Sequence, residues 1–213
     1  MAVVYKNCVT FRSKSDEGRF LTRQYTPSKI GNGYFEIPIK VYDDGRFSRI
    51  VATWKLGDMI DWRGPYDTEH EFNFRGMPSL LIVCGGTGIA PIPRILERIF
   101  GDERVETRVR LVCCFSDPSS VLFREEISKW TTNWNCQIAC YFSRKEEEAK
   151  LPYLVEVHNE RFTEVAFEEQ LEKLDTLSPH PTLIVCGSLA FEKDVINYAI
   201  RQGIPSEKRI RFA

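Results

Sequence analysis

Apolar and polar residues follow two different patterns in the two parts of the chain. Up to about residue 76, short runs with period-two alternation are separated by turn signals rich in Gly, Asn and Asp. This pattern predicts antiparallel strands, and hence a small barrel or sandwich. The predicted strands include NCVTFRS (7–13), YFEIPIKVY (34–42) and MIDWRG (59–64). GRFSRIVATWKLGD (45–58) breaks the alternation and indicates one short helix.

From about residue 80 the apolar runs are continuous, which is typical of strands buried on both faces of a parallel sheet. They are LLIVCG (80–85), VRLVCCF (109–115), CQIACYF (136–142) and TLIVCG (182–187), with RIRF (209–212) as a last short strand. Helix-like segments accompany them at 93–100, 119–130, 167–174 and 190–203, with Asp117 or Ser119 as the N-cap of the second. We therefore expect a two-domain α+β and α/β fold: a partial antiparallel barrel over residues 1–76, then a doubly wound parallel sheet over residues 77–213.

Composition narrows the functions that the chain can perform. A net charge of −1 over 213 residues gives no reason to expect a nucleic-acid partner. No apolar run approaches the roughly 18 residues that cross a bilayer, and the N-terminus lacks a signal-peptide pattern. We expect a cytoplasmic chain whose membrane association, if present, comes from a segment or partner outside it. The seven cysteines include no CxxC pair, which argues against zinc or another metal site and favours reduced thiols in the core.

Three glycines separate the first continuous strand from the helix that follows it. Gly85, Gly86 and Gly88 allow a tight turn at the carboxyl edge of the sheet, where ligands bind in open parallel sheets. The next helix is expected to begin at or near Pro91, and its N-terminus suits a phosphate group. The stretch matches neither the G-x-G-x-x-G fingerprint nor a P-loop. A tight turn without a ligand therefore stays open as an alternative.

Two further segments carry candidate chemistry. In VCGS (185–188), Cys186 and Gly187 end another buried strand, so we expect them to face the glycine turn across one crevice. In RQYTP (23–27), Arg23 can bind a phosphate, Tyr25 can stack on a flat ring and Thr26 can hydrogen-bond a ring nitrogen.

Taken together, these segments resemble those of the ferredoxin reductase superfamily. RQYTP is similar to its Arg-x-Tyr-Ser/Thr flavin motif, and IKVY (39–42), GRFS (45–48), GDMIDWRGP (57–65), GGTGIAP (85–91) and VCGS follow in the family's order. The nearest resemblance is to the NADH-cytochrome b5 reductases, in particular the subgroup called b5 reductase-like, and it covers the chain from about residue 8. It implies a flavin-binding antiparallel barrel followed by a nucleotide-binding α/β domain.

The resemblance also implies roles for individual residues. Arg23 would hold the FAD pyrophosphate, Tyr25 would lie along the isoalloxazine, and Thr26 would lie near its N5. The implied cofactor-binding set is Arg23, Tyr25, Thr26, Ile39, Lys40, Val41, Gly45, Arg46, Phe47, Ser48, Gly85, Gly86, Thr87, Gly88, Cys186 and Gly187. Within it, residues 45–48 would cradle the diphosphate, Lys40 would face the nicotinamide nucleotide's phosphates, and Gly85–Gly88 would position the nicotinamide. Phe212 would match the family's C-terminal aromatic residue.

The implied reaction passes hydride from NADH to FAD, and then single electrons to a haem protein of the cytochrome b5 type. Thr26, Thr87 and Cys186 would lie nearest the reacting rings, and no acid–base residue is required for the hydride step. After the third continuous strand, Ser143 and Arg144 stand where NADPH-using relatives bind the 2′-phosphate. Glu146, Glu147 and Glu148 follow and would repel it. We therefore favour NADH over NADPH.

One alternative function stays open. The family's flavin domain has further strands ahead of the one ending in RQYTP, so relative to the family we expect an N-terminally shortened barrel. The alternative is a non-catalytic nucleotide-binding or regulatory module from a truncated reductase. A hydrolase is disfavoured because there is no G-x-S-x-G, and because His70, His158 and His180 lie in polar, loop-like contexts that predict surface positions.

Overall fold

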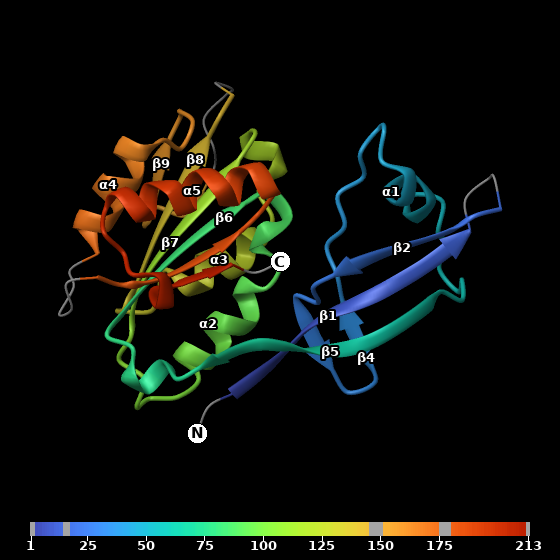
Figure 1. Ribbon diagram of the computed structural model, residues 1–213, viewed down its shortest axis with the longest axis horizontal. Coiled ribbons are helices and arrows are strands. Elements are labelled where there is room, and N and C mark those ends of the chain that lie inside the picture. The colour runs from blue at the N-terminus through green and yellow to red at the C-terminus, as the bar shows by residue number, and fades with distance from the viewer. Residues whose placement is uncertain (1–2, 15–17, 145–150, 175–179, 212–213) are drawn as a thin grey trace. The chain divides into compact units, whose positions relative to one another are not determined.

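Residues 3–14, 18–144, 151–174 and 180–211 are described by the computed structural model. The chain divides into a first unit, Met1–Asn73 with Ala90–Arg94, and a second unit, Phe74–Ile89 with Ile95–Ala213 (Figure 1). The division after Asn73 and the boundary expected at residue 76 both fall near the 3₁₀ turn Phe74–Gly76. Within the described residues, no helix has both the length and the apolar character needed to span a bilayer.

The first unit is built on an antiparallel sheet with the order β2–β1–β5. Its elements are β1 (Val3–Lys14), β2 (Phe20–Tyr25), the hairpin β3 (Lys29–Gly31) and β4 (Tyr34–Glu36), the helix α1 (Arg46–Val51) and β5 (Asp61–Phe72). In the central strand β1, Phe11 stands opposite Arg23 on one side and Trp62 on the other. The strand expected over 34–42 was too long: it ends at Glu36, shortly before Pro38, which has no N–H to donate to a ladder.

A small aromatic core holds the first unit together. Val9, Phe11 and Phe47 are buried at its centre. The ring of Phe11 lies 5.8 Å from that of Tyr25 and 5.7 Å from that of Trp54, between ring centroids. Ring spacings of this kind contribute about 0.5–1.5 kcal/mol each beyond the burial of apolar area. The core thus joins the sheet, through Phe11 and Tyr25, to α1 and the segment after it.

The second unit contains a six-stranded sheet with the order β11–β10–β6–β7–β8–β9, in which every neighbouring pair is parallel. The strands are β6 (Ser79–Gly85), β7 (Arg108–Phe115), β8 (Cys136–Phe142), β9 (Val155–His158), β10 (Thr182–Cys186) and β11 (Arg209–Arg211). This is the doubly wound arrangement expected from the sequence, so the predicted fold class is confirmed.

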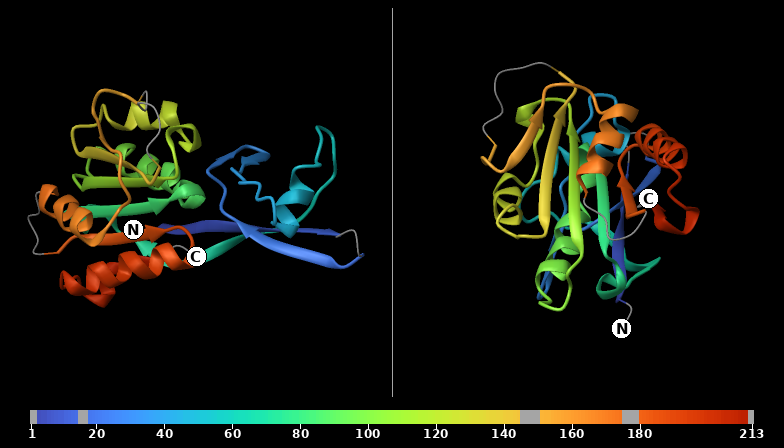
Figure 2. Two further views of the ribbon diagram at one scale, coloured as in Figure 1. Left: turned by 90° about the horizontal axis from the view of Figure 1, so that it is seen from above. Right: turned by 90° about the vertical axis from the view of Figure 1, so that its left-hand side faces the viewer.

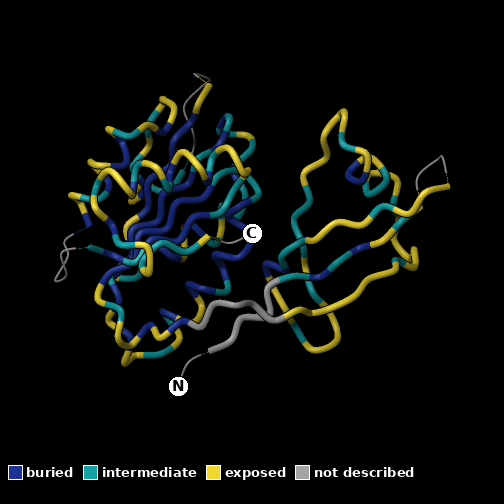
Figure 3. The backbone as a smooth tube through the Cα atoms, viewed as in Figure 1, coloured by how far each residue is buried: buried dark blue, intermediate teal, exposed yellow. Residues whose placement is uncertain are grey.

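Helices cover both faces of this sheet (Figure 2). They are α2 (Ile92–Phe100), α3 (Arg124–Trp130), α4 (Glu164–Lys173) and α5 (Leu189–Arg201). On one face, Leu81, Val83, Val112 and Val185 pack against Phe167 of α4 and Val195 of α5. The alternate strand residues point to the opposite face, which α2 and α3 cover. Figure 3 shows the central strands as continuous buried runs, in accord with their sequence pattern.

Two details of the second unit differ from the expectations. The strand β9 was missed, because VEVH is short and alternates instead of forming a continuous apolar run. The helix expected over 119–130 begins only at Arg124, because Phe123 adopts a left-handed conformation with φ 59°. Asp117 caps the preceding 3₁₀ turn Pro118–Ser120 instead, by accepting a hydrogen bond from the Ser120 N–H.

Candidate functional site

The carboxyl ends of β6 and β10 meet at the point where the strand order of the second unit reverses. The chain leaves β6 toward β7, β8 and β9 on one side, and then returns to β10 and β11 on the other. Cys84 in β6 stands opposite Cys186 in β10. In open α/β sheets, ligands bind outside the carboxyl ends of the strands at such a switch point.

The glycine turn after β6 is shaped by close backbone packing. A 3₁₀ turn, Gly86–Ile89, follows the strand, and α2 begins at Ile92, next to the expected Pro91. A Cβ added at Gly88 would lie 2.8 Å from the Gly187 Cα and even nearer to the carbonyl of Cys186. Only a glycine therefore fits at position 88. The structure thus brings together the two motifs that were expected to share one edge.

Gly86 has the opposite surroundings. It adopts a left-handed conformation with φ +54°, and a Cβ added there would meet no atom within 4 Å. The turn therefore bends sharply at Gly86 and leaves open space beside its α carbon. This space, at the switch point of the sheet, fits a nucleotide that lies against the backbone.

The phenyl ring of Phe191, in α5, packs against Gly85 at the end of β6 and against Gly187 after β10. A Cβ at Gly85 would lie 3.1 Å from the Phe191 ring, and one at Gly187 would lie 2.7 Å from it. The helix is held in place by Ser188, its N-cap, which accepts a hydrogen bond from the Phe191 N–H at 3.3 Å. Sequence reasoning missed Phe191, because an aromatic residue in the first turn of a helix gives no sign of packing against glycines.

Cys186 is half-buried between these turns. Burial and the neighbouring carboxylate of Glu192 raise the pKa of its thiol to about 12. At neutral pH the thiol is therefore protonated and is not an activated nucleophile. This state is compatible with a packing wall for a ligand, which is the role expected for Cys186.

Glu192 is the second residue that sequence reasoning missed. It lies in the first turn of α5, is 1% exposed, and accepts a hydrogen bond from the Gly187 N–H at 3.2 Å. In the sequence it stands in FEKD, which reads as an ordinary solvated helix face. The sequence pattern therefore did not indicate that the Glu192 carboxylate is buried beside Gly187.

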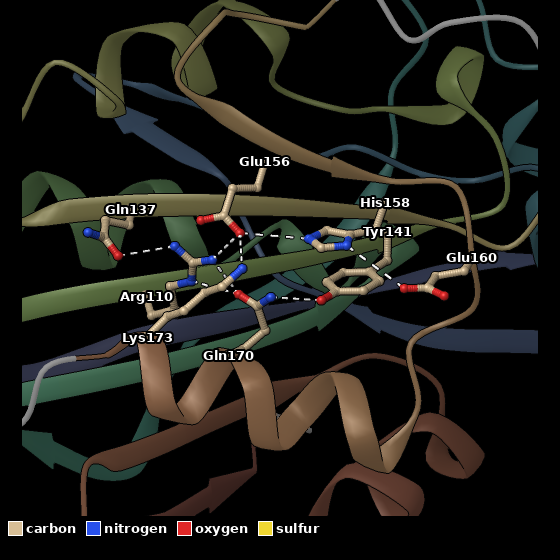
Figure 4. Close-up of polar contacts among 8 residues, drawn as sticks. All are labelled: Arg110, Gln137, Tyr141, Glu156, His158, Glu160, Gln170 and Lys173. Atoms are coloured by element: carbon tan, nitrogen blue, oxygen red, sulfur yellow. Dashed lines mark hydrogen bonds and ion pairs between the residues drawn. The ribbon is translucent and has the colours of Figure 1, made fainter.

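A polar network occupies the β7–β9 side of the same unit (Figure 4). Arg110 of β7 is 1% exposed, and its Nε donates to Gln170 Oε1 of α4 at 2.7 Å. The amide of Gln170 donates to the Tyr141 hydroxyl at 2.7 Å, and Arg110 also pairs with Glu156 of β9 at 2.6 Å. Burial raises the pKa of Tyr141 to about 12, so its hydroxyl is neutral at physiological pH. The network fixes α4 and β9 on the sheet.

His158 belongs to this network and not to a surface loop. His158 is the last residue of β9, and 22% of its side chain is exposed. Its imidazole stacks on the ring of Tyr141. The expected surface position was therefore wrong for His158. The expectation of a loop was also wrong for His70, which lies within β5.

The segment after β8 continues the sheet edge by two residues. The N–H groups of Ser143 and Arg144 donate to the carbonyls of Phe115 and Ser116, at 3.1 and 2.9 Å. Both residues therefore lie at the carboxyl ends of β7 and β8, on the edge that carries the glycine turn. Glu146, Glu147 and Glu148, which entered the expected choice of nucleotide, lie outside the described residues, as does Phe212.

In the first unit, the structure gathers part of the expected flavin-binding set around Tyr25. Burial raises the pKa of the Tyr25 phenol, Arg23 lowers it and Tyr42 raises it, so these three side chains lie near one another. The Lys40 ammonium lies 5.3 Å from the centroid of the Tyr42 ring. Arg23, Lys40, Val41 and Tyr42 are all exposed, whereas Thr26 and Ile39 are partly buried. Tyr42 was not singled out from the sequence, although it ends the IKVY motif.

The segment Gly45–Ser48 forms the start of α1. The Ser48 hydroxyl accepts from the Tyr42 N–H at 3.1 Å and donates to the Gly45 carbonyl at 3.3 Å, so it closes the turn before the helix. The ring of Phe47 is 2% exposed and lies in the core. The backbone N–H groups of Arg46, Phe47 and Ser48 belong to the first helical turn, where a helix offers them no acceptor. These donors, with the guanidinium of Arg23 and two phenol rings, fit a dinucleotide that carries a flat ring and a diphosphate.

Two family models match the chain. The first, described as an oxidoreductase FAD-binding domain, matches residues 6–70. The second, described as an oxidoreductase NAD-binding domain, matches residues 82–197. Among curated proteins, the human protein named NADH-cytochrome b5 reductase-like is 32% identical over 195 residues. The match covers 90% of this chain and 61% of that protein, so the chain spans about three fifths of the relative's length.

Solved structures share the fold. The cytochrome b5 reductase domain of Ulva prolifera nitrate reductase is similar with a TM-score of 0.77 and 18% identity, over 99% of this chain and 85% of that one. The CS-b5R domains of human Ncb5or, in an NAD+ form, are similar with a TM-score of 0.79 and 17% identity, over 98% of this chain and 60% of that one. At these identities the likeness establishes the two-domain fold.

Proposed function

This chain belongs to the family of oxidoreductases that carry an FAD-binding domain and an NAD-binding domain, and we propose that it passes hydride from NADH to FAD and then electrons to a haem protein of the cytochrome b5 type. The observation that carries the proposal is the packing of Gly88 against Cys186 and Gly187 at the switch point of the sheet. In the same turn, a Cβ added at Gly86 would meet no atom within 4 Å, so a nucleotide can approach the backbone there.

The residues of the second unit would bind and orient the nicotinamide nucleotide. Gly85, Gly86 and Gly88 let it approach the backbone, Thr87 offers a hydroxyl, and the protonated Cys186 with Gly187 forms the opposite wall. None of these groups moves a proton during hydride transfer, so their contribution is positioning and the exclusion of water. Ser143 and Arg144 would lie near the adenosine ribose. We favour NADH there because of the acidic run that follows them in the sequence.

The residues of the first unit would bind FAD. When bound, FAD supplies the redox chemistry, because it accepts a hydride at N5 and passes electrons on one at a time. Arg23 and the N–H groups of Arg46, Phe47 and Ser48 would hold the diphosphate, with Gly45 before them. Tyr25, with Ile39 and Val41, would line the flat ring, Thr26 would hydrogen-bond it, and Lys40 would attract the nucleotide phosphates.

The haem-protein acceptor is proposed from the curated relative, whose name specifies NADH and cytochrome b5. We propose a cytoplasmic location because of the state of the cysteines. All seven lie in the described part of the chain and are thiols and not disulfides, which suits the reducing cytoplasm.

A second candidate is a nucleotide-binding or regulatory module without flavin chemistry. It is favoured by the exposure of large apolar side chains in the first unit, where Tyr34, Tyr42 and Trp62 are 50%, 51% and 45% exposed. Exposed large apolar side chains are typical of surfaces that contact a partner.

The two candidates differ in electron transfer. The test incubates the chain with FAD, removes the excess, and supplies NADH or NADPH with either ferricyanide or cytochrome b5. Reduction of both acceptors, faster with NADH, supports the proposal. Reduction of ferricyanide alone would contradict the haem-protein acceptor. Binding of NAD+ without reduction of either acceptor would favour the second candidate.

A further inference from the structure

A buried carboxylate joins three segments at the nucleotide edge of the second unit. Glu192 lies in the first turn of α5, and only 1% of the residue is exposed. Its Oε1 accepts from the Gly187 N–H at 3.2 Å, and its Oε2 accepts from Arg211 Nη2 at 2.9 Å and Nε at 3.2 Å. A buried carboxylate is costly unless it is paired and hydrogen-bonded, and both oxygens of Glu192 have such partners.

Arg211 brings the last strand into this contact. It is the final residue of β11 and stands in parallel register with Val185, directly before Cys186. Its side chain is half exposed, whereas that of Glu192 is 2% exposed. Glu192 thus ties the start of α5 and the end of β11 to the turn that follows β10.

The peptide held by Glu192 is the one against which the glycine turn packs. A Cβ at Gly88 would lie 2.8 Å from Gly187 Cα, and a Cβ at Gly187 would lie 3.5 Å from the backbone N of Gly85. With so little space, a rotation of the Gly187 peptide has to displace the backbone of the glycine turn. The orientation of Gly187 is therefore coupled to that of Gly85 and Gly88, which lie on either side of Gly86 in the turn.

We propose that Glu192 is a positioning residue for the nicotinamide nucleotide: its carboxylate fixes the Gly187 peptide, and Arg211 holds the carboxylate in place. This proposal rests on the proposed function only in taking the Gly85–Gly88 edge as the nucleotide site. Glu192 acts through Gly187 and does not itself contact the nucleotide. Its essential property is a hydrogen-bond acceptor at the Gly187 N–H, and the ion pair with Arg211 is the support.

This division of roles separates positioning from simple stabilisation. Glutamine at position 192 keeps an acceptor of the same reach without the charge, whereas leucine has similar bulk and no acceptor. If the pair only stabilised the fold, the folded forms of both neutral double variants would bind NAD+ with the same affinity, whatever their unfolding midpoints. If Glu192 positions Gly187, the two double variants differ in nucleotide affinity.

The experiment compares Glu192→Gln/Arg211→Gln with Glu192→Leu/Arg211→Leu in the full chain. The Kd of NAD+ is measured by titration calorimetry, and the unfolding midpoint is recorded for each variant. We expect the glutamine pair to bind NAD+ within about threefold of wild type, and the leucine pair to bind at least about tenfold more weakly, because its Gly187 N–H lacks an acceptor. Equal Kd values for the two pairs would overturn the proposal.

A matched control changes another ion pair of α5. Arg201 pairs with Glu164 of α4, away from the turn. Glu164→Gln/Arg201→Gln should leave the Kd of NAD+ unchanged, and an effect equal to that of the leucine pair would overturn the specific role of Glu192.

A second measurement does not depend on how the variants fold. In the wild-type chain, amide hydrogen exchange at Gly187 should be slow, both without NAD+ and with it. Exchange as fast as in an exposed loop would overturn the proposal. A wild type that binds NAD+ but reduces no acceptor would contradict the proposed function and leave the Glu192 proposal standing; a wild type that does not bind NAD+ would overturn both.

Discussion

The imidazole of His158 lies parallel to the phenol ring of Tyr141, with an interplanar angle of 4° and 4.3 Å between ring centroids. The stack joins the carboxyl ends of β8 and β9, since the two residues are partners in the parallel register. It rests on a chain of hydrogen bonds that runs from the Tyr141 hydroxyl through Gln170 to Arg110. The edge of the sheet beside the proposed nucleotide site therefore depends on the buried guanidinium of Arg110, which lies farther down the strand β7.

Arg110→Met should be strongly destabilising. Removal of the guanidinium leaves the buried Gln170 oxygen without its donor, which costs about 1–3 kcal/mol, and also removes one donor each from Gln137 and Glu156. Urea unfolding followed by fluorescence measures the loss. Arg104→Met is the matched control, because Arg104 is 72% exposed in its pair with Asp102 and should cost less than about 1 kcal/mol. Equal losses for the two variants would show that the Arg110 network does not hold the sheet and α4 together.

Stability should fall in acid because of Glu156. Burial raises the pKa of this carboxyl, but hydrogen bonds from Arg110 and Lys173 outweigh that effect and lower the pKa from 4.5 to about 2. A carboxyl with a lowered pKa in the folded state stabilises the protein above its unfolded pKa, and this contribution is lost as the pH falls from 4.5 toward 2. Unfolding free energies measured over this range should decrease less in Glu156→Gln than in wild type. Parallel curves would contradict the assignment.

Much of the second unit could be predicted from the sequence, because its physical causes are local. The strands β6, β7, β8 and β10 are continuous apolar runs, since both of their faces are covered by helices. The glycine turn was recognisable because glycine adopts the left-handed backbone of Gly86 most readily and is the one residue type that fits the close approach at Gly88. Gly203, with φ 72°, follows the end of α5 as expected for a helix C-terminus.

The parts that could not be predicted depend on contacts between distant segments. Glu192 and Arg211 are 19 positions apart and appear as surface charges in the sequence, and only the fold brings them to one turn. Arg110 and Gln170 are 60 positions apart, and neither belongs to a motif. The roles assigned to Arg23, Tyr25, Thr26, Thr87 and the other cofactor-binding residues remain predictions, because they concern bound nucleotides.

Gly86→Asn and Gly88→Ala should fail in different ways. Asparagine tolerates a left-handed backbone, and the space beside Gly86 is open, so Gly86→Asn should keep its unfolding midpoint while its side chain fills the nucleotide site. We expect its Kd for NAD+ to rise by at least about tenfold. Gly88→Ala forces a Cβ against the Cys186 carbonyl and should lose about 1–3 kcal/mol of stability. Calorimetry and thermal unfolding of both variants separate the effects, and a Gly86→Asn chain with normal affinity would place the nucleotide elsewhere.

Cys186 should react slowly with alkylating agents at neutral pH. With a thiol pKa of about 12, the thiolate fraction and hence the alkylation rate should rise about tenfold per pH unit between about pH 7 and about pH 9, without a plateau. Peptide mapping after iodoacetamide treatment follows Cys186 separately from the other cysteines, and saturating NAD+ should slow its reaction further. A plateau near neutral pH would mean that the thiol is activated, and unchanged rates with NAD+ would remove Cys186 from the nucleotide site.

The most direct test of the proposed reaction is the visible absorption spectrum of the chain after incubation with FAD and removal of the excess, recorded before and after anaerobic addition of NADH. The account predicts flavin bands that remain with the protein and bleach on addition of NADH, and weaker bands in Arg23→Ala, because the diphosphate loses its cation. Arg12→Ala, which changes an exposed arginine of the same sheet, is the control and should retain flavin as wild type does. A wild-type chain that retains no flavin, or flavin that NADH does not bleach, would contradict the proposed reductase.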